Sequence, residues 1–393
     1  MTDTHAHLLL LIKSALTNEK YTLPAAFDAA SVFAAAKAHG ATVLAYYGAL
    51  NCSVDSTCEA MREAFSRVCR EMLVGERQTA DVEALMRALD ECGADFMGLK
   101  GVHLKKHYLR QEMRRMSDAD ILVKMDQYDR IRPLMLSLGY TEGVESDHEY
   151  NWRKGSTHIE LHKRLIPSYN KDYYAYFGDG WQLAKPVCEG AFEYRMSAED
   201  EMIYLFTHFA KHYRDAGIGV RHIADLWVFR NANPDMDEEY IKNELTVLKL
   251  YDFYRNILRT ISALFEDGER DEVTDFIAEV IMSSGEYGKK ATGVVSAALK
   301  EKKTGKNAQA IMRGKVIHSL FLPYKDMCVE YPVLKKAPVL LPIMWGTRIV
   351  SRALTKGKVR NFAKTQLKLK DTEIDNYQQT LDFVGLDFNF SEQ

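Results

Sequence analysis

Two stretches of the chain decide its fold, residues 96–101 (FMGLKG) and residues 117–123 (SDADILV). The first reads as a short apolar strand that ends in a glycine turn, and the second reads as a strand that begins with two carboxylates. Because side chains alternate along a strand, Asp118 and Asp120 project from one face while Ile121 projects from the other. Two carboxylates on one strand face predict a divalent-metal site.

A third stretch, residues 157–162 (THIELH), also alternates. It places His158, Glu160 and His162 on one face and apolar residues on the other, which is typical of a strand with one face in the core and one in a site. A two-metal site needs a further carboxylate from a neighbouring strand, and Glu160 is placed to supply it. One of the two histidines is expected to orient a carboxylate or to contact a nucleotide.

The turn Lys100-Gly101 ends the first strand and opens a helix. Glycine there lets the backbone approach a phosphate, the helix amino end offers unpaired N–H groups, and lysine adds positive charge. The alternative is an ordinary strand-to-helix turn. Arg114 and Arg115 precede the acidic strand and could hold a triphosphate or be solvated, and both interpretations of Arg114 stay open.

The remaining pattern is mostly helical, which makes the expected fold class α+β. A helix is expected to begin after Ser197, whose hydroxyl is suited to an N-cap. Further helices are expected over residues 25–39, 55–92, 102–109 and 128–138, with a strand and a turn over 140–152. The predicted domains are a helical region over 1–94, a core over 95–190 and a helical domain over 191–393.

Two polar pairs in the helical domain have a spacing of four residues, which puts each pair on one helix face. His208 and His212 have the spacing of a zinc pair, yet no HExxH pattern and no third ligand accompany them. A substrate or phosphate contact and structural hydrogen bonding are the other interpretations. Arg221 and Asp225 most simply form an ion pair on an exposed helix surface.

Composition indicates a soluble, globular protein, since 47% of the 393 residues are hydrophobic and no apolar run is long enough to span a membrane. The six cysteines form no CxxC pair, and the amino terminus lacks the features of a signal peptide, so we expect a reduced, cytoplasmic setting.

Charge is distributed unevenly along the chain. Residues 302–370 carry a net charge of about +14, so the rest carries about −17 of the net −3. This basic segment could dock on a phosphate or another anion, nucleic acid and lipid included, or it could neutralise an acidic neighbour in the fold.

These motifs together, LKG at 99–101, Arg114 with the DADILV strand, and IELH at 159–162, resemble an uncharacterised nucleotidyltransferase family of the DNA polymerase beta superfamily. The resemblance is densest over residues 95–165 and implies a minimal mixed sheet with helices on one side. It also implies that Asp118, Asp120 and Glu160 are metal carboxylates. Lys100-Gly101 stands where the superfamily usually has Gly-Ser.

The function that we expect is a metal-dependent transfer of an NMP group from an NTP to an unidentified acceptor hydroxyl, with release of pyrophosphate and with Mg²⁺ or Mn²⁺ as the cofactor. The acceptor is expected to be anionic if the basic segment assists its binding; nucleic acid is possible but not indicated. The expected nucleotide contacts are Lys100, Gly101, Arg114 and Ser117. The candidate substrate contacts are His162, His208, His212 and Arg221.

Two other classes of protein fit parts of this pattern. A glycosyltransferase also uses Asp-x-Asp to hold a metal on a sugar nucleotide, but it would need an alternating nucleotide-binding domain before the acids, where this chain reads as helical. A regulatory module could keep the fold and bind a nucleotide without catalysis. The presence of all three carboxylates argues against that module.

Overall fold

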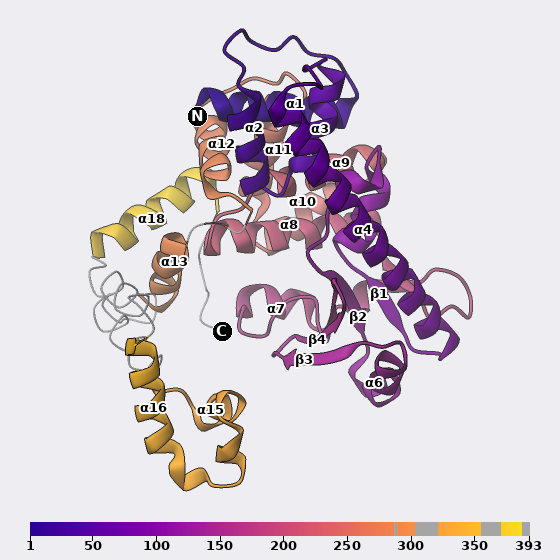
Figure 1. Ribbon diagram of the computed structural model, residues 1–393, viewed down its shortest axis with the longest axis vertical. Coiled ribbons are helices and arrows are strands. Elements are labelled where there is room, and N and C mark those ends of the chain that lie inside the picture. The colour runs from indigo at the N-terminus through magenta and orange to yellow at the C-terminus, as the bar shows by residue number, and fades with distance from the viewer. Residues whose placement is uncertain (287, 289, 303–320, 355–370, 387–393) are drawn as a thin grey trace. The chain divides into compact units, whose positions relative to one another are not determined.

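The computed structural model of the chain describes residues 1–286, 288, 290–302, 321–354 and 371–386 (Figure 1). Contacts divide the chain into two compact units, Met1–Gly288 with a short C-terminal stretch, and Lys289–Phe383. The domain bounds expected from the sequence stay a prediction. Of the basic segment 302–370, the stretches 303–320 and 355–370 lie outside the described residues.

The chain begins with four helices, α1 (Asp3–Thr17), α2 (Ala29–Ala38), α3 (Thr42–Asn51) and α4 (Glu59–Glu91). Their starts are capped where the sequence offers an oxygen: the Asp28 side chain accepts from two backbone N–H groups at the start of α2. Helices α1 and α3 cross so closely that a Cβ on Gly48 would lie 1.9 Å from the Leu11 carbonyl oxygen. Only glycine permits this crossing.

Five strands follow and form one mixed sheet. They are β1 (Phe96–Gly98), β2 (Ala119–Val123), β3 (Thr141–Glu145), β4 (Glu149–Lys154) and β5 (Thr157–His162), in the order β1-β2-β5-β4-β3. Strands β2 and β5 run parallel, and every other pair is antiparallel. In the parallel pair Asp120 lies opposite Glu160, so the two carboxylates occupy neighbouring positions on the same face of the sheet.

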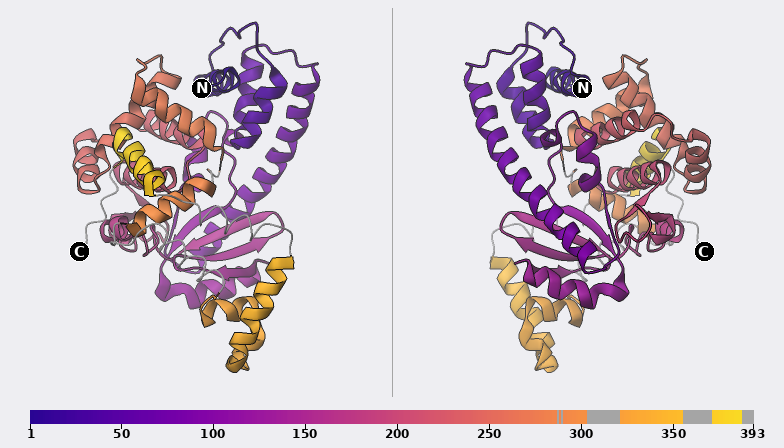
Figure 2. Two further views of the ribbon diagram at one scale, coloured as in Figure 1. Left: turned by 90° about the vertical axis from the view of Figure 1, so that its left-hand side faces the viewer. Right: turned by 90° about the vertical axis from the view of Figure 1, so that its right-hand side faces the viewer.

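Helices cover the opposite face of the sheet, where α4 lies across the strands and α6 (Tyr128–Ser137) packs beside it (Figure 2). The core there joins Leu85 and Leu89 of α4 to Ile121 of β2 and to Ile159 and Leu161 of β5. Since side chains alternate, this packing leaves the acidic positions of β2 and β5 on the other face. The predicted α+β fold, with a mixed sheet and helices on one side, is confirmed.

The segment between β1 and β2 differs from its prediction. Instead of one helix over residues 102–109, it contains α5 (Gly101–Leu104) and two 3-10 turns, Lys105–His107 and Gln111–Met113. Tertiary contacts explain the difference. Tyr108 donates to Asp225 at 2.7 Å, and the ring of His107 packs edge-on against Phe229, so α9 holds this segment out of a regular helix.

The first unit is completed by α7 (Lys171–Phe177), a small hairpin of β6 (Ala184–Pro186) and β7 (Tyr194–Met196), and five more helices. These helices are α8 (Ala198–Asp215), α9 (Val220–Ala232), α10 (Glu238–Val247), α11 (Tyr251–Phe265) and α12 (Glu272–Ser284). Ser197 caps α8 as predicted, since its hydroxyl accepts from the N–H of Asp200 at 3.1 Å.

Described helices of the second unit are α13 (Lys290–Lys302), α15 (Tyr324–Glu330), α16 (Leu341–Leu354) and α18 (Asp371–Val384), the last of which ends at the boundary with the first unit. Short 3-10 turns at Pro332–Lys335 and Pro338–Leu340 join α15 to α16. None of the helices in the described part of the chain is long and apolar enough to cross a membrane. All six cysteines are free.

Candidate active site

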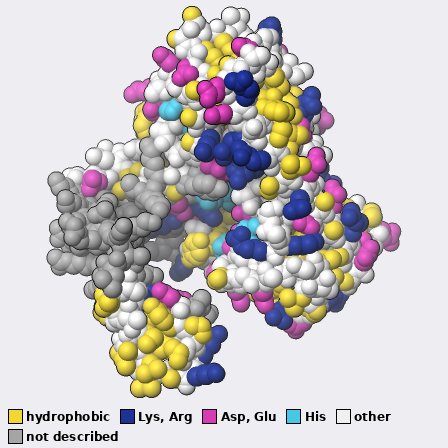
Figure 3. Space-filling view, in the orientation of Figure 1, with side chains coloured by type: hydrophobic (Ala, Val, Ile, Leu, Met, Phe, Trp, Pro, Cys, Tyr) yellow, Lys and Arg dark blue, Asp and Glu magenta, His cyan; other side chains and the backbone are white. Residues whose placement is uncertain are grey.

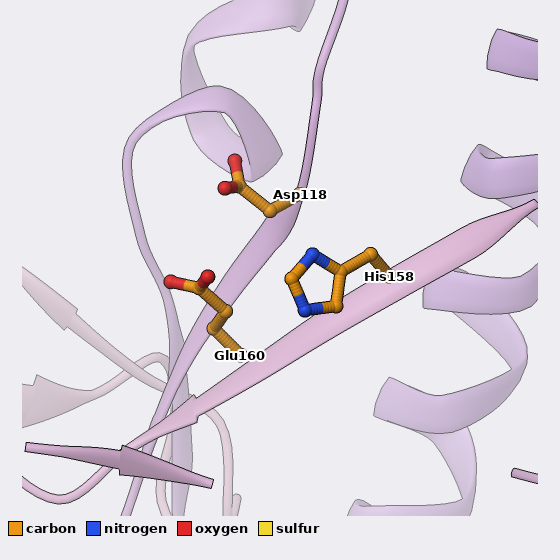
Figure 4. A group of neighbouring side chains, drawn as sticks. All are labelled: Asp118, His158 and Glu160. Atoms are coloured by element: carbon orange, nitrogen blue, oxygen red, sulfur yellow. The ribbon is translucent and has the colours of Figure 1, made fainter. Parts of the chain in front are cut away.

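Three carboxylates meet on the face of β2 and β5 that α4 leaves uncovered. Asp118 directly precedes β2, Asp120 lies on β2, and Glu160 lies beside it on β5. Ligand atoms of Asp118, His158 and Glu160 all lie within 4.8 Å of one another, and so do those of Asp120, Glu160 and His162. Figure 4 shows the carboxylates of Asp118 and Glu160 on the same side of the two strands, with the His158 ring beside them. Glu160 therefore belongs to both groups.

The Asp120 side chain is buried, and two basic side chains donate hydrogen bonds to it. Its Oδ1 accepts from Lys100 Nζ at 2.9 Å and from His162 Nε2 at 2.8 Å. Burial would raise the pKa of the Asp120 carboxyl, but the Lys100 charge and the His162 hydrogen bond outweigh burial and hold this pKa well below its usual range. The Asp120 side chain is therefore a carboxylate at neutral pH.

The pKa values of the two partners of Asp120 are shifted upward. Burial lowers the pKa of His162, yet its hydrogen bonds to Asp120 and Glu160 prevail and raise this pKa to about 8. The pKa of Lys100 is also raised, because attraction to Asp120 exceeds the cost of burial. Lysine, imidazolium and carboxylate thus form one buried charge network.

The Lys100-Gly101 turn is tight. Lys100 has a positive φ of 45°, and a Cβ on Gly101 would come within 2.9 Å of the Met116 side chain. This geometry aims the lysine at Asp120, whose backbone carbonyl also accepts from the Leu99 N–H at 2.9 Å. The turn therefore fixes a positive charge against the acidic strand.

A cavity of about 360 Å³ opens in front of the carboxylates, a volume that suits a small-molecule ligand. The sheet forms one wall, and α8 and α9 form the other. In the view of Figure 3, histidine and basic side chains gather around a hollow in this face of the molecule. The residues that α8 and α9 contribute are Leu205, His208, Phe209, Lys211, His212, Arg221, His222, Asp225 and Leu226.

The helical wall contains a row of neutral histidines. His208 Nε2 lies 3.1 Å from His212 Nε2, and the ring of His222 on α9 lies 6.5 Å from that of His212. Burial lowers the pKa of all three. The nearby charges of Lys100 and Lys211 add to this lowering at His208 and His212, and the pKa of His212 falls to about 3. Two groups of residues in the described part of the chain could hold a metal ion, and both include Glu160. Neither group includes His208 or His212.

The prediction of an exposed ion pair between Arg221 and Asp225 is wrong. Both side chains are buried, and each finds a partner outside its own helix. Arg221 Nη1 donates to Glu286 Oε1 at 2.8 Å, and Asp225 Oδ1 accepts from Arg114 Nε at 2.6 Å. The face of α9 that carries them packs inward, so burial selects these distant partners. Arg114 is thereby buried and paired rather than solvated.

Sequence reasoning missed several polar residues that line the cavity, among them His148 and Glu149. The Glu149 carboxylate lies 2.9 Å from His148 Nε2. Burial would raise the pKa of Glu149, but its interaction with His148 outweighs burial and lowers this pKa to about 2. The register of β4 and β5 places Glu149 opposite His162. This pairing would have identified Glu149 as a neighbour of the site. The sequence of 140–152 predicted a strand and a turn but did not show which residues of that strand lie opposite 157–162.

The other predicted residues are also at the cavity. Ser117 lines it and donates its hydroxyl to Asp118 at 2.8 Å. The structure thus brings together every residue that was expected to contact the nucleotide or the substrate, while their roles stay predictions.

A mixed sheet with carboxylates on two adjacent parallel strands, facing a cavity, is the arrangement that the resemblance found in the sequence implies. Comparison with protein families agrees: residues 25–266 match the model described as "Uncharacterised nucleotidyltransferase". Since the match covers more than half of the chain, the protein belongs to this family, and the resemblance found in the sequence is confirmed. Searches of curated proteins and of solved structures found no match.

Proposed function

We propose that the protein is a metal-dependent nucleotidyltransferase that moves an NMP group from an NTP to an acceptor hydroxyl and releases pyrophosphate. Family membership supports nucleotidyl transfer in general. The observation that carries the specific proposal is the register of β2 with β5, which sets Asp120 beside Glu160 and close to Asp118. This arrangement matches what the DNA polymerase beta superfamily would require.

The donor set fits Mg²⁺ or Mn²⁺. Three carboxylates offer the hard oxygen ligands that these ions prefer. The residues that would hold the ions are Asp118, Asp120 and Glu160. When bound, divalent ions neutralise the phosphates and lower the pKa of the attacking hydroxyl.

The chain's own residues orient the reactants. Lys100 supplies positive charge beside the carboxylates, and the Gly101 turn lets phosphate approach the backbone. Arg114 and Ser117 also line the cavity and complete the proposed nucleotide contacts. The acceptor oxygen attacks the α-phosphorus in line, its proton passes to Asp120 or Glu160, and the bond to the β-phosphate oxygen breaks, so that pyrophosphate leaves with the electron pair.

In this proposal the acceptor substrate binds against the cavity wall formed by α8 and α9. Neutral imidazoles of His208 and His212 can donate and accept hydrogen bonds, which suits a hydroxyl group. Arg221 lies in the same wall, near its buried partner Glu286. His162 lies between the two substrates in this scheme, since it contacts Asp120 and Glu160.

Incubation with each α-labelled NTP, with Mg²⁺ or Mn²⁺ and a cell extract, tests the proposal. Transfer of label to an acceptor is expected for the wild type and should be lost in the double variant Asp118→Asn/Asp120→Asn. The matched control is Asp126→Asn/Asp129→Asn, because both residues are exposed and the change in charge is equal. Unchanged transfer in the first variant would sink the proposal. Turnover of a sugar nucleotide alone would indicate a glycosyltransferase, and binding without turnover a regulatory module.

A further inference from the structure

Over residues 341–351, the part of the helix whose side chains the structure describes, α16 (in the second unit) presents an uncharged face to solvent. The exposed residues there are Pro342, Ile343, Gly346, Thr347, Val350 and Ser351. Ile343 is 60% exposed, Val350 is 58% exposed, and Val339 in the preceding turn is 81% exposed. A surface helix ordinarily turns its charged residues outward, so the polarity of this helix is reversed.

The reversal is built into the packing around α16. Arg348 is only 3% exposed and donates to Glu330 of α15 at 2.8 Å, so this charge is directed inward. Trp345 packs against the small core around Met327 and Leu334, and its Nε1 donates to the Leu322 carbonyl at 2.9 Å. These contacts fix which side of α16 faces outward, and the exposed apolar side chains are a stable feature of the folded unit.

Positive charge accompanies this apolar face. Lys335 and Lys336 are exposed in the turn between α15 and α16, and exposed Val333 and Val339 flank them. Figure 3 shows the hydrophobic side chains gathered over α15 and α16, with Lys and Arg at their edge. The sequence of 302–370 adds a net charge of about +14.

We propose that residues 321–354 form a membrane-docking surface that binds anionic lipid, with the uncharged face of α16 lying in the headgroup region. An apolar helix face with lysines at its border is the arrangement by which helices bind in the plane of a membrane surface, and a polybasic sequence adds attraction to anionic lipids. This inference does not depend on the proposed nucleotidyl transfer, because it uses none of the residues of the cavity.

Two other occupants fit less well. A second copy of the chain would bring two strongly positive segments together, and their repulsion opposes such a dimer. Nucleic acid would be held by lysine and arginine on phosphates and by aromatic stacking on bases. The large exposed side chains of α16 itself, Ile343 and Val350, are aliphatic, and the exposed aromatic residues Phe321 and Tyr324 lie outside this helix. An anionic membrane uses both the aliphatic surface and the charge.

Sedimentation of the full chain with lipid vesicles tests the proposal. The wild type is expected to bind vesicles of phosphatidylcholine with phosphatidylserine and to bind pure phosphatidylcholine vesicles much more weakly. The variant Ile343→Glu/Val350→Glu should lose binding by about tenfold or more, since two exposed aliphatic groups that would enter the headgroup region become anions facing an anionic surface. Lys335→Gln/Lys336→Gln should lose a smaller part, and this loss should shrink as salt is added.

The matched control is Val247→Glu in α10, since Val247 is 69% exposed but lies in the first unit. This variant should bind vesicles like the wild type, and circular dichroism confirms that each variant is folded. Three results would overturn the proposal: no binding of the wild type to anionic vesicles, equal binding to both kinds of vesicle, or binding unaffected by the two glutamates. Tight binding of single-stranded RNA that is unaffected by the same glutamates and displaces the vesicles would assign the surface to nucleic acid instead.

Discussion

Replacement of Lys100 by methionine tests whether the Lys100 ammonium occupies a position that a divalent metal ion can take instead. Lys100 Nζ lies 2.9 Å from Asp120 Oδ1 in a buried setting. At an effective dielectric constant of about 20, charges at this distance attract by roughly 6 kcal/mol before the cost of dehydration is subtracted. Breaking one side of a buried pair typically costs about 3 to 5 kcal/mol. Because His162 still donates to Asp120, we expect the free energy of unfolding to fall by about 3 kcal/mol.

A divalent ion should reverse much of this loss. In Lys100→Met the carboxylates of Asp120 and Glu160 lack a positive neighbour that the wild type has, so Mg²⁺ or Mn²⁺ should stabilise the variant more than the wild type. Urea unfolding with EDTA and then with Mn²⁺ measures both effects. This readout is independent of NTP turnover.

An exposed ion pair provides the control. Arg132 and Glu142 lie 2.8 Å apart with both side chains largely exposed, so Arg132→Met should cost no more than about 1 kcal/mol, and Mn²⁺ should stabilise it no more than it stabilises the wild type. The reasoning is refuted if Mn²⁺ stabilises Lys100→Met and the wild type equally, or if the loss in Lys100→Met is no larger than in the control.

Three further predictions concern stability. The unfolded state binds a proton on His212 below pH 6.5, whereas the folded pKa is about 3, so His212 alone should lower stability by about 1.4 kcal/mol per pH unit as pH drops below 6.5. His212→Gln should lessen this slope in urea unfolding at pH 7.5 and 5.5; an unchanged slope would contradict it. Gly48→Ala should cost about 3 kcal/mol, since its Cβ would strike a backbone oxygen of α1, while Gly75→Ala in open space should be neutral or stabilising; equal thermal shifts would count against this. Arg114→Met should destabilise by about 3 kcal/mol or more, and Arg114→Met/Asp225→Asn should recover part of that loss; additive effects in a double-mutant cycle would speak against coupling of the pair.

The sheet and its acidic face could be predicted because strand alternation is a local rule. The spacing of Asp118 and Asp120 fixes their common face whatever lies next to the strand, and the same holds for Glu160 within 157–162. The resemblance to the family then supplied the mixed sheet and the three carboxylates that would hold metal. The pairing of β2 with β5 agrees with the predicted common face of the carboxylates, and the family match agrees with the resemblance.

The buried ion pairs could not be predicted, because the helix-spacing rule considers only partners on the same helix. It coupled Arg221 to Asp225, whereas Asp225 pairs with Arg114, 111 positions earlier, and Arg221 pairs with Glu286, 65 positions later. Such partners depend on how α9 packs, and packing is decided by contacts that are distant in sequence. The reversed polarity of α16 was hidden for the same reason, since it depends on the inward pairing of Arg348 with Glu330.

The two walls of the cavity differ in charge, and this difference bears on how substrates are divided between them. The sheet wall holds carboxylates with Lys100 and protonated His162, whereas burial keeps His208 and His212 neutral in the helical wall. Cationic histidines would be drawn to the carboxylates and would compete with a divalent ion for them. Neutral imidazoles leave that charge to the metal and the triphosphate, yet they keep a donor and an acceptor for a hydroxyl group. In the proposed reaction, the low pKa values of the helical wall therefore help to keep the nucleotide and acceptor sides of one cavity distinct.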